Sequence, residues 1–472
     1  MTLAGADVLR LLMSLGLLVI AAHAVGHAFT LIRQPRVIGE IVGGLLLGPT
    51  VLGMVLPSWH DALFPESGAS AAVLGWSYQL GLLLLMFCSG AEMRTAFRPD
   101  EARVVGLVTV LGVTVPFLAG LVVFITLDPT GLAGPSGSKT ALMLVFGLAV
   151  AVTSIPVISR IMVDLGIIDT SFARVVLGVA VLEDLVVYVV LALALGMVSA
   201  PEATAFGLPA VLGLEPGSGL EMVTHTATTG AFMAAMGLGG PIVFRWLRTS
   251  RWNLVSTSSP IAFHLVFLFG GTIAALWLGI TPIFGAFMAG IATSSASDAE
   301  SIQARASVKA FSFAYFVPVY FAIVGVQLDL VHSFRPWFFC WFLVFACAVK
   351  SASAYAGARL AGEPRHSSRN IALATNARGG PGIVLASVAF GAGIVSEQFY
   401  TSLVLLAIVT SMITGTWLGR IARSGKALRD EPLAPSADPA PLHVGRRVPL
   451  RRRAHAFGVH RSDTFGEASG RR

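Results

Sequence analysis

Long runs of apolar residues, separated by short polar segments, follow one another from Val8 almost to Gly419. An apolar helix of about 20 residues crosses the roughly 30 Å hydrocarbon layer of a bilayer. Barrel strands would instead alternate polar and apolar residues over about ten positions. The pattern therefore predicts an all-α polytopic membrane protein. We place about thirteen transmembrane helices at residues 8–32, 37–56, 71–91, 104–127, 140–163, 173–199, 223–247, 257–279, 281–296, 310–327, 336–361, 370–395 and 398–420.

The predicted span at 140–163 is interrupted near its middle by a short polar stretch, Ala151-Val-Thr-Ser-Ile-Pro156. Pro156 removes a helix hydrogen bond, and the hydroxyl groups of Thr153 and Ser154 can bind the backbone groups that this leaves unpaired. The stretch predicts a discontinuous helix.

The predicted span at 370–395 has a second interruption, in which a charged residue is followed by glycines and a proline. The residues concerned are Arg378, Gly379, Gly380 and Pro381. The two interrupted spans are seven apart, an odd number, so they cross the membrane in opposite directions. This arrangement predicts an inverted repeat with two crossing discontinuous helices that form an ion site at the bilayer midplane. Two unrelated proline kinks are the alternative.

Composition agrees with a membrane protein and separates a tail from the rest. Hydrophobic residues make up 55% of the chain and charged residues 12%, against about 25% charged residues in soluble domains. From Arg420 onward there are twelve Lys or Arg against five Asp or Glu. We predict a transmembrane domain at 1–420 and a basic, disordered cytoplasmic tail at 421–472. A nucleic-acid-binding tail is the alternative, and we expect no nucleic-acid partner.

Lys and Arg residues near the ends of the predicted spans fall mostly on one side of the membrane. Because cytoplasmic loops carry this excess, we predict the N-terminus outside and the C-terminus inside, in the inner (plasma) membrane of the cell. The majority side holds fifteen residues: Arg33, Arg36, Arg94, Arg98, Arg103, Arg160, Arg174, Arg245, Arg248, Arg251, Arg305, Lys309, Arg359, Arg365 and Arg369. The other side holds three: Arg10, Lys139 and Arg335.

The cysteines, Cys88, Cys340 and Cys347, lie inside apolar runs, where they behave as small hydrophobic residues. Neither a CxxC motif nor Cys/His ligand spacing occurs among them. We expect no resident metal, no cofactor and no enzymatic activity.

Two adjacent acidic residues, Glu183 and Asp184, lie in the middle of the predicted span at 173–199. Charges inside spans are candidates for functional sites. Consecutive helix positions point about 100° apart, so we expect one carboxylate to line an aqueous funnel and the other to reach a fixed partner. Burial favours a protonated carboxyl group, which allows protons and cations to compete for it. A purely structural ion pair is the alternative.

Two basic residues, Lys350 and Arg378, are placed at depth and need compensation, because an unpaired buried charge is costly. We predict a pair between Glu183 and Lys350. For Arg378 we predict contact with the carbonyl-rich interruption, with Glu40, Glu92 or Asp184 as alternative partners. Thr153 and Ser154 hydroxyls and unwound carbonyls are candidate cation ligands with Asp184. His23, His27 and His264 are candidate proton relays, although packing roles are the more common ones.

Several motifs resemble those of the monovalent cation:proton antiporter-2 family, the Kef- and Nap-type exchangers. They occur in the order of the family and cover nearly the whole predicted membrane part. The matching stretches are residues 35–53, 81–92, 153–160, 285–290 and 316–321, together with Gly325 and Arg378-Gly379.

The resemblance implies a thirteen-span fold in which a core of crossing broken helices moves against a dimerisation panel, and hence a homodimer. It places Asp184 at the family's essential ion-binding aspartate, which is alternately protonated and loaded with cation. It places Lys350 at the family's late-span lysine. Glu183 occupies the preceding position, which is Asp, Asn or Gln in relatives; an acidic residue there is associated with electrogenic exchange.

The sequence thus predicts a secondary transporter that exchanges Na+ or K+ for protons by alternating access. Three alternatives remain at this stage: a sodium-coupled symporter of a small organic solute on a similar fold, a non-transporting sensor or scaffold subunit, and an antiporter-like subunit of a respiratory complex.

Overall fold

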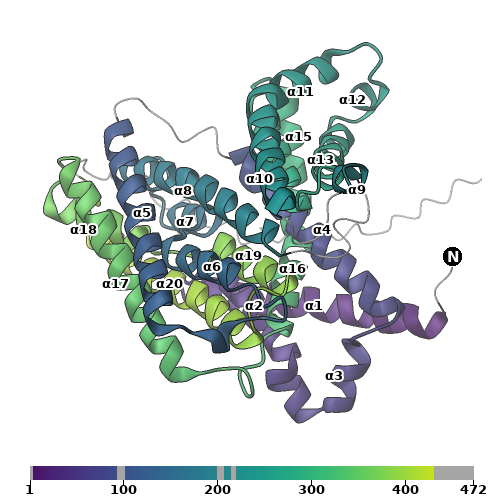
Figure 1. Ribbon diagram of the computed structural model, residues 1–472, viewed down its shortest axis with the longest axis horizontal. Coiled ribbons are helices and arrows are strands. Elements are labelled where there is room, and N and C mark those ends of the chain that lie inside the picture. Colours follow the sequence, from purple (N-terminus) through teal and green to yellow (C-terminus); the bar gives the residue numbers. More distant parts are fainter. Residues whose placement is uncertain (1–3, 93–100, 199–206, 214–218, 430–472) are drawn as a thin grey trace, which may run out of the picture. The chain divides into compact units, whose positions relative to one another are not determined.

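The computed structural model describes residues 4–92, 101–198, 207–213 and 219–429, and most of the predicted basic tail lies outside these ranges. Within them the regular structure is helical, apart from one isolated bridge between Ala133 and Val395 (Figure 1). The prediction of an all-α chain is confirmed for the described residues.

Eight helices pack on one another as two similar sets of a long helix, a broken helix and a second long helix. We call them the crossing group. The first set is α5 (Ala102–Leu127), α6 (Lys139–Ala151), α7 (Ile155–Asp164) and α8 (Ser171–Gly196). The second set is α17 (Pro336–Leu360), α18 (Arg365–Ala374), α19 (Gly379–Gly391) and α20 (Glu397–Arg423). The same order of elements in both sets agrees with the predicted repeat.

The other long helices pack mainly among themselves, through the contacts of α1 with α2, α2 with α16, and α4 with α14. We call them the flanking group. Its members are α1 (Gly5–Leu31), α2 (Arg36–Leu47), η1 (Pro49–Gly53), α3 (Pro57–Leu63), α4 (Ala69–Glu92), α13 (Pro260–Trp277), α14 (Pro282–Thr293), α15 (Ala299–Phe311), η6 (Ser312–Phe316) and α16 (Val317–Val326). The remaining elements are η4 (Thr130–Leu132), α9 (Gly207–Val211), α10 (Gly219–Ala234), η5 (Ala235–Gly239), α11 (Gly240–Thr249) and α12 (Leu254–Ser258).

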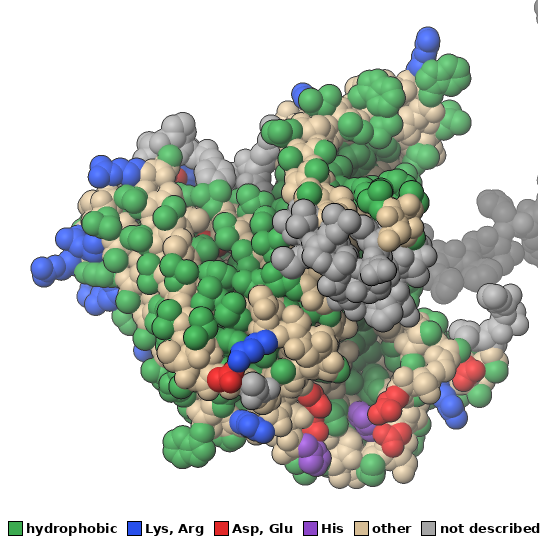
Figure 2. All heavy atoms as spheres, in the orientation of Figure 1, with side chains coloured by type: hydrophobic (Ala, Val, Ile, Leu, Met, Phe, Trp, Pro, Cys, Tyr) green, Lys and Arg blue, Asp and Glu red, His purple; other side chains and the backbone are tan. Residues whose placement is uncertain are grey.

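Ten helices or continuous helical runs of the described chain are long and apolar enough to cross a membrane. The other three predicted spans, 140–163, 281–296 and 370–395, correspond to the two broken helices and to α14, which has 12 residues. Apolar side chains cover much of the face seen in Figure 2, with Lys and Arg gathered at its left and top and others below its centre. Each predicted span therefore corresponds to a helix or a broken helix, and the interruptions make the helices on either side shorter than the predicted spans.

Glycines allow two pairs of flanking helices to approach closely. A Cβ atom on Gly90 of α4 would overlap the carbonyl oxygen of Phe287 on α14, and one on Gly290 would overlap that of Phe87. A Cβ atom on Gly44 of α2 would likewise overlap the backbone of α16. Small residues at such contacts bring backbones together and strengthen the packing of helices in lipid.

The chain remains attached to the crossing group for a few residues beyond α20. Leu428 is buried, and its carbonyl oxygen accepts a hydrogen bond from the Asn370 amide at 3.0 Å. The next residue, Arg429, pairs with Glu363 at 2.8 Å and with Glu101 at 3.6 Å. These contacts lie at the start of the segment predicted as tail, whose remainder begins at Asp430, outside the described residues.

Replacing Gly290 by alanine should lower the thermal stability of the protein, because the new methyl group meets the backbone of α4. Gly270 of α13 is the matched control, since no atom lies within 4 Å of a Cβ placed there. Alanine favours a helix by about 1 kcal/mol over glycine, so Gly270→Ala should leave the thermal midpoint unchanged or raise it. The measurement is the midpoint in detergent, followed by size-exclusion chromatography; equal midpoints for the two variants would refute the close packing.

Candidate functional site

The first broken helix is interrupted between Ala151 and Ile155, where three residues leave the helical conformation. Ser154 is extended and forms the N-cap of α7, its hydroxyl oxygen accepting from the backbone N–H of Val157. Pro156 lies in the first turn of α7, where the backbone donor that it lacks would have no partner within the helix. The interruption predicted from Thr153, Ser154 and Pro156 is therefore present.

The second broken helix is interrupted between Ala374 and Gly379, and Arg378 precedes the first turn of α19. Gly379 is required by space: a Cβ atom there would overlap the side chain of Val157 in α7. Pro381 also falls in the first turn, among the backbone positions that need no donor. Both starts are thus shaped to fit against each other.

Hydrogen bonds join the two interruptions directly. The backbone N–H of Ser154 donates to the carbonyl oxygen of Ala377 at 2.7 Å, and its hydroxyl accepts from the N–H of Gly380 at 3.0 Å. The hydroxyl of Thr153 donates to the carbonyl oxygen of Thr375 at 2.5 Å. The predicted crossing of the discontinuous helices is present, and the hydroxyls proposed as cation ligands hold it together.

Arg378 is 1% exposed and donates to backbone carbonyls. Its Nε donates to Ala149 at 3.1 Å and its Nη2 to Val150 at 3.0 Å, both in the last turn of α6. A helix carries partial negative charge at its C-terminus, so a cation is favoured there. The carbonyl-rich contact predicted for Arg378 is present.

Two of the carboxylates considered as alternative partners of Arg378 pair with other cations. Glu40 pairs with Arg36 at 3.1 Å, and Glu92 pairs with Lys309. Two of the histidine candidates are engaged elsewhere: His264 bonds the carbonyl oxygen of Pro260 at 2.7 Å, and His23 that of Ala314 at 2.9 Å.

Lys350 is fully buried and uses all three ammonium hydrogens. It donates to Glu183 Oε2 at 2.8 Å, to the carbonyl oxygen of Ala151 at 2.5 Å and to that of Gly112 at 2.9 Å. The predicted Glu183–Lys350 pair is therefore present. Because Ala151 is the last residue of α6, a second cation lies at the end that Arg378 already caps.

Asp184 differs from its neighbour in having no partner. It is fully buried, and among the described residues neither of its carboxylate oxygens has a hydrogen bond, whereas one oxygen of Glu183 is held by Lys350. An unpaired carboxylate is costly in a medium of low polarity. Burial therefore favours a side chain that carries a proton or a cation over a bare carboxylate.

The sequence did not indicate Ser411, whose hydroxyl accepts from the backbone N–H of Gly379 at 3.2 Å. It lies in an apolar helix with several other hydroxyl residues, and nothing in the spacing distinguishes it. Tyr188 was also missed, although it lies one helical turn after Asp184.

Comparison with known proteins identifies relatives along most of the chain. The family model described as "Sodium/hydrogen exchanger, transmembrane" matches residues 16–424. The chain is 28% identical over 413 residues to the K(+)/H(+) antiporter 1 of Saccharomyces cerevisiae, covering 84% of this chain and 45% of the relative. It is 26% identical to the Na(+)/H(+) antiporter NhaS4 of Synechocystis, covering 85% of this chain and 94% of the relative.

The chain thus spans about half the length of the yeast relative and nearly all of the cyanobacterial one. Among solved structures, the sodium proton antiporter MjNhaP1 from Methanocaldococcus jannaschii matches with a TM-score of 0.57 at 14% identity, covering 88% of this chain and 99% of that one. This likeness shows a shared fold.

Removing one partner of the Glu183–Lys350 pair should destabilise the protein more than removing both charges. Lys350→Met leaves a buried carboxylate unpaired and should cost about 3–5 kcal/mol, whereas the double variant with Glu183→Gln should recover most of that loss. Thermal unfolding of the single and double variants measures the difference. A double variant no more stable than Lys350→Met would contradict the pairing.

Proposed function

The chain belongs to the transmembrane sodium/hydrogen exchanger family, and on that basis we propose that it exchanges a monovalent cation, Na+ or K+, for protons by alternating access. The observation that carries the proposal is the Asp184 carboxylate, fully buried and without a hydrogen-bond partner in the described chain. The names of the relatives, which include Na(+)/H(+) and K(+)/H(+) antiporters, support it.

In the proposed cycle a proton or a cation occupies Asp184, and the crossing group then moves against the flanking group to expose the site on the other side. Lys350 and Arg378 stay with the crossing group, since their partners Gly112, Ala149 and Ala151 belong to it. The ion site therefore moves as one body.

Coupled exchange of the cation and the proton requires that the crossing group does not move across the membrane while Asp184 is ionised and carries neither ion. An ionised Asp184 that carries neither ion is an unpaired charge in a medium of low polarity, which is unfavourable by several kcal/mol. Proton-loaded and cation-loaded states avoid this cost, so only they move readily. The same carboxylate thus binds both ions and prevents a leak.

A symporter of an organic solute is the second candidate, and it fits the geometry less well. Such a solute needs a roomy polar cavity beside Asp184. A void lined by Tyr188, Ser89 and Pro381, one helical turn from Asp184 along α8, has no room for a water molecule. It therefore gives an organic solute no room.

The proposal extends to assembly and location. We place the protein in the plasma membrane as a homodimer, joined through the flanking group so that the crossing group is free to move. The close contacts among flanking helices, such as α2 with α16 and α4 with α14, favour a rigid group that stays fixed while the crossing group moves.

Asp184→Asn should abolish cation-dependent proton flux in proteoliposomes while the protein stays folded, because the amide cannot exchange a proton. Asp128→Asn is the matched control. Asp128 is exposed and pairs with Lys139 at 2.6 Å on the surface, so its removal should leave flux near the wild-type rate. Retained flux in Asp184→Asn, with Na+, K+ and Li+ each tested, would refute the assignment.

We further propose electrogenic exchange, on the basis of the buried Glu183–Lys350 pair. Exchange of one cation for one proton at Asp184 leaves the charge of the site unchanged. A second proton is moved if cation binding draws Glu183 away from Lys350 and the lysine releases a proton. An imposed membrane potential should then drive proton flux in proteoliposomes, and Glu183→Gln should weaken that response; flux insensitive to potential would indicate one-for-one exchange.

A further inference from the structure

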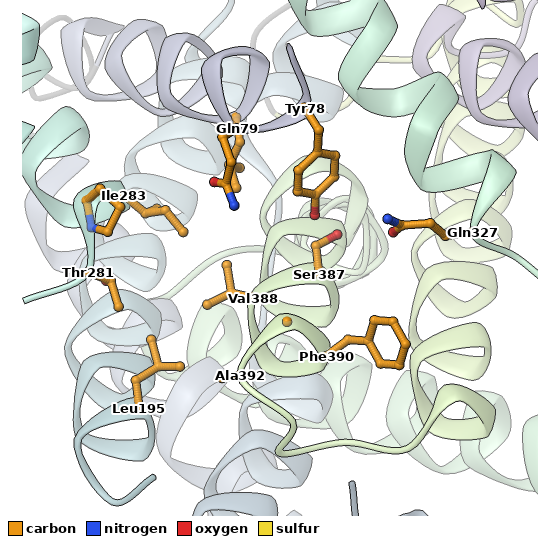
Figure 3. A pocket seen from close by; sticks show the side chains of 13 residues that line it. Tyr78, Gln79, Leu195, Thr281, Ile283, Gln327, Ser387, Val388, Phe390 and Ala392 are labelled. Atoms are coloured by element: carbon orange, nitrogen blue, oxygen red, sulfur yellow. The ribbon is translucent and has the colours of Figure 1, made fainter. Parts of the chain in front are cut away.

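A cavity of about 420 Å³ opens between the crossing and flanking groups, at some distance along the helices from Asp184. It is mostly apolar, with a few uncharged polar side chains. Figure 3 shows Gln79 and Gln327 reaching toward it from two sides and the Tyr78 hydroxyl pointing at Ser387. The cavity has room for water molecules, and none of the described residues that line it is charged.

Three helices line both this cavity and the narrow void beside Tyr188. On α4 and α19 the lining residues are spaced by three or four, and on α8 by seven. Such residues share one face of a helix. On α4 they are Tyr78, Leu82, Leu85 and Ser89; on α19 they are Pro381, Val384, Ser387 and Gly391. On α8, Leu195 lines the cavity and Tyr188 lines the void. We call these faces of α4, α8 and α19, which run from the cavity to the void, the groove.

The groove points from the cavity toward Asp184. Asp184 lies one turn before Tyr188 and eleven residues before Leu195 on α8, which corresponds to about 16 Å along a helix. On α19 the groove ends at Gly380 and Pro381, which belong to the crossing of the broken helices. On α8, Tyr188 therefore lies between Leu195, which lines the cavity, and Asp184.

Tyr188 contacts the flanking group through its hydroxyl and its ring. Its hydroxyl meets the Met86 sulfur at 3.6 Å, and its ring packs edge-on against Phe287, with centroids 4.7 Å apart. The ring of Phe284 lies at 6.2 Å. Tyr188 belongs to the crossing group, so movement of that group against α4 and α14 changes these contacts.

We propose that the Tyr188 side chain is the gate between the cavity and Asp184: its ring blocks the groove in this state, and its displacement admits the ion. The inference rests on the proposed function only in taking Asp184 as the destination. Tyr188 is a positioning residue that controls access, and its contacts with Met86 and Phe287 couple access to the position of the crossing group.

Cysteine accessibility tests the gate without requiring transport. In a background of Cys88→Ala, Cys340→Ala and Cys347→Ala, Gln79→Cys reports on the cavity and Asp184→Cys reports on the space behind Tyr188. A small impermeant thiosulfonate is added to membrane vesicles of each orientation. The side from which Gln79→Cys reacts identifies the cavity entrance.

From that side, Asp184→Cys should react at least about tenfold faster with Tyr188→Ala than with Tyr188 intact. Tyr188→Phe keeps the ring and should leave the rate slow, which separates the ring from the hydroxyl. Tyr188→Val serves as a second opened variant, and an unchanged rate at Gln79→Cys shows that the folded cavity is preserved.

The gate is refuted if Asp184→Cys stays unreactive in both opened variants while Gln79→Cys reacts normally. In that case Asp184-dependent flux in the wild-type protein still supports the proposed function. Conversely, Tyr188-dependent labelling in a protein that shows no flux with Na+, K+ or Li+ supports the gate and refutes the exchange.

Discussion

The structure depends on how the C-terminus of α6 is satisfied in the interior of the protein. A helix that ends there leaves carbonyl oxygens without partners, and lipid offers no donors. Arg378 binds the carbonyls of Ala149 and Val150, and Lys350 binds that of Ala151. Both cations come from the second repeat, so one helix end ties the two repeats together.

This arrangement gives the adjacent acids different environments. Lys350, fixed by two carbonyls, presents its remaining hydrogen to Glu183. The next residue on α8 points about 100° away, and neither oxygen of Asp184 has a hydrogen bond in the described chain. The paired acid and the unpartnered acid are therefore neighbours in the sequence, and loss of an ion from Asp184, as proposed, would leave the contacts of Lys350 in place.

Much of this could be predicted from the sequence, because it depends on local rules. Interrupted apolar runs, and charges in the middle of spans, identify the broken helices and the Glu183–Lys350 pair. The role of Ser411 and the position of Tyr188 could not be predicted, since each depends on which helices meet in space. The assignment of Asp184 as the transported-ion site remains a prediction, and the tail beyond Asp430 lies outside the described residues.

The attachment of Leu428 and Arg429 has a practical consequence for observing the protein at work. Their partners Asn370, Glu363 and Glu101 all lie in or beside helices of the crossing group, whereas the chain enters the flanking group at Gly5. A fluorophore fused directly after Arg429 would be attached to the crossing group, and a fluorophore ahead of α1 would be attached to the flanking group. The efficiency of energy transfer between the two fluorophores would then report, in real time, the movement of the crossing group relative to the flanking group.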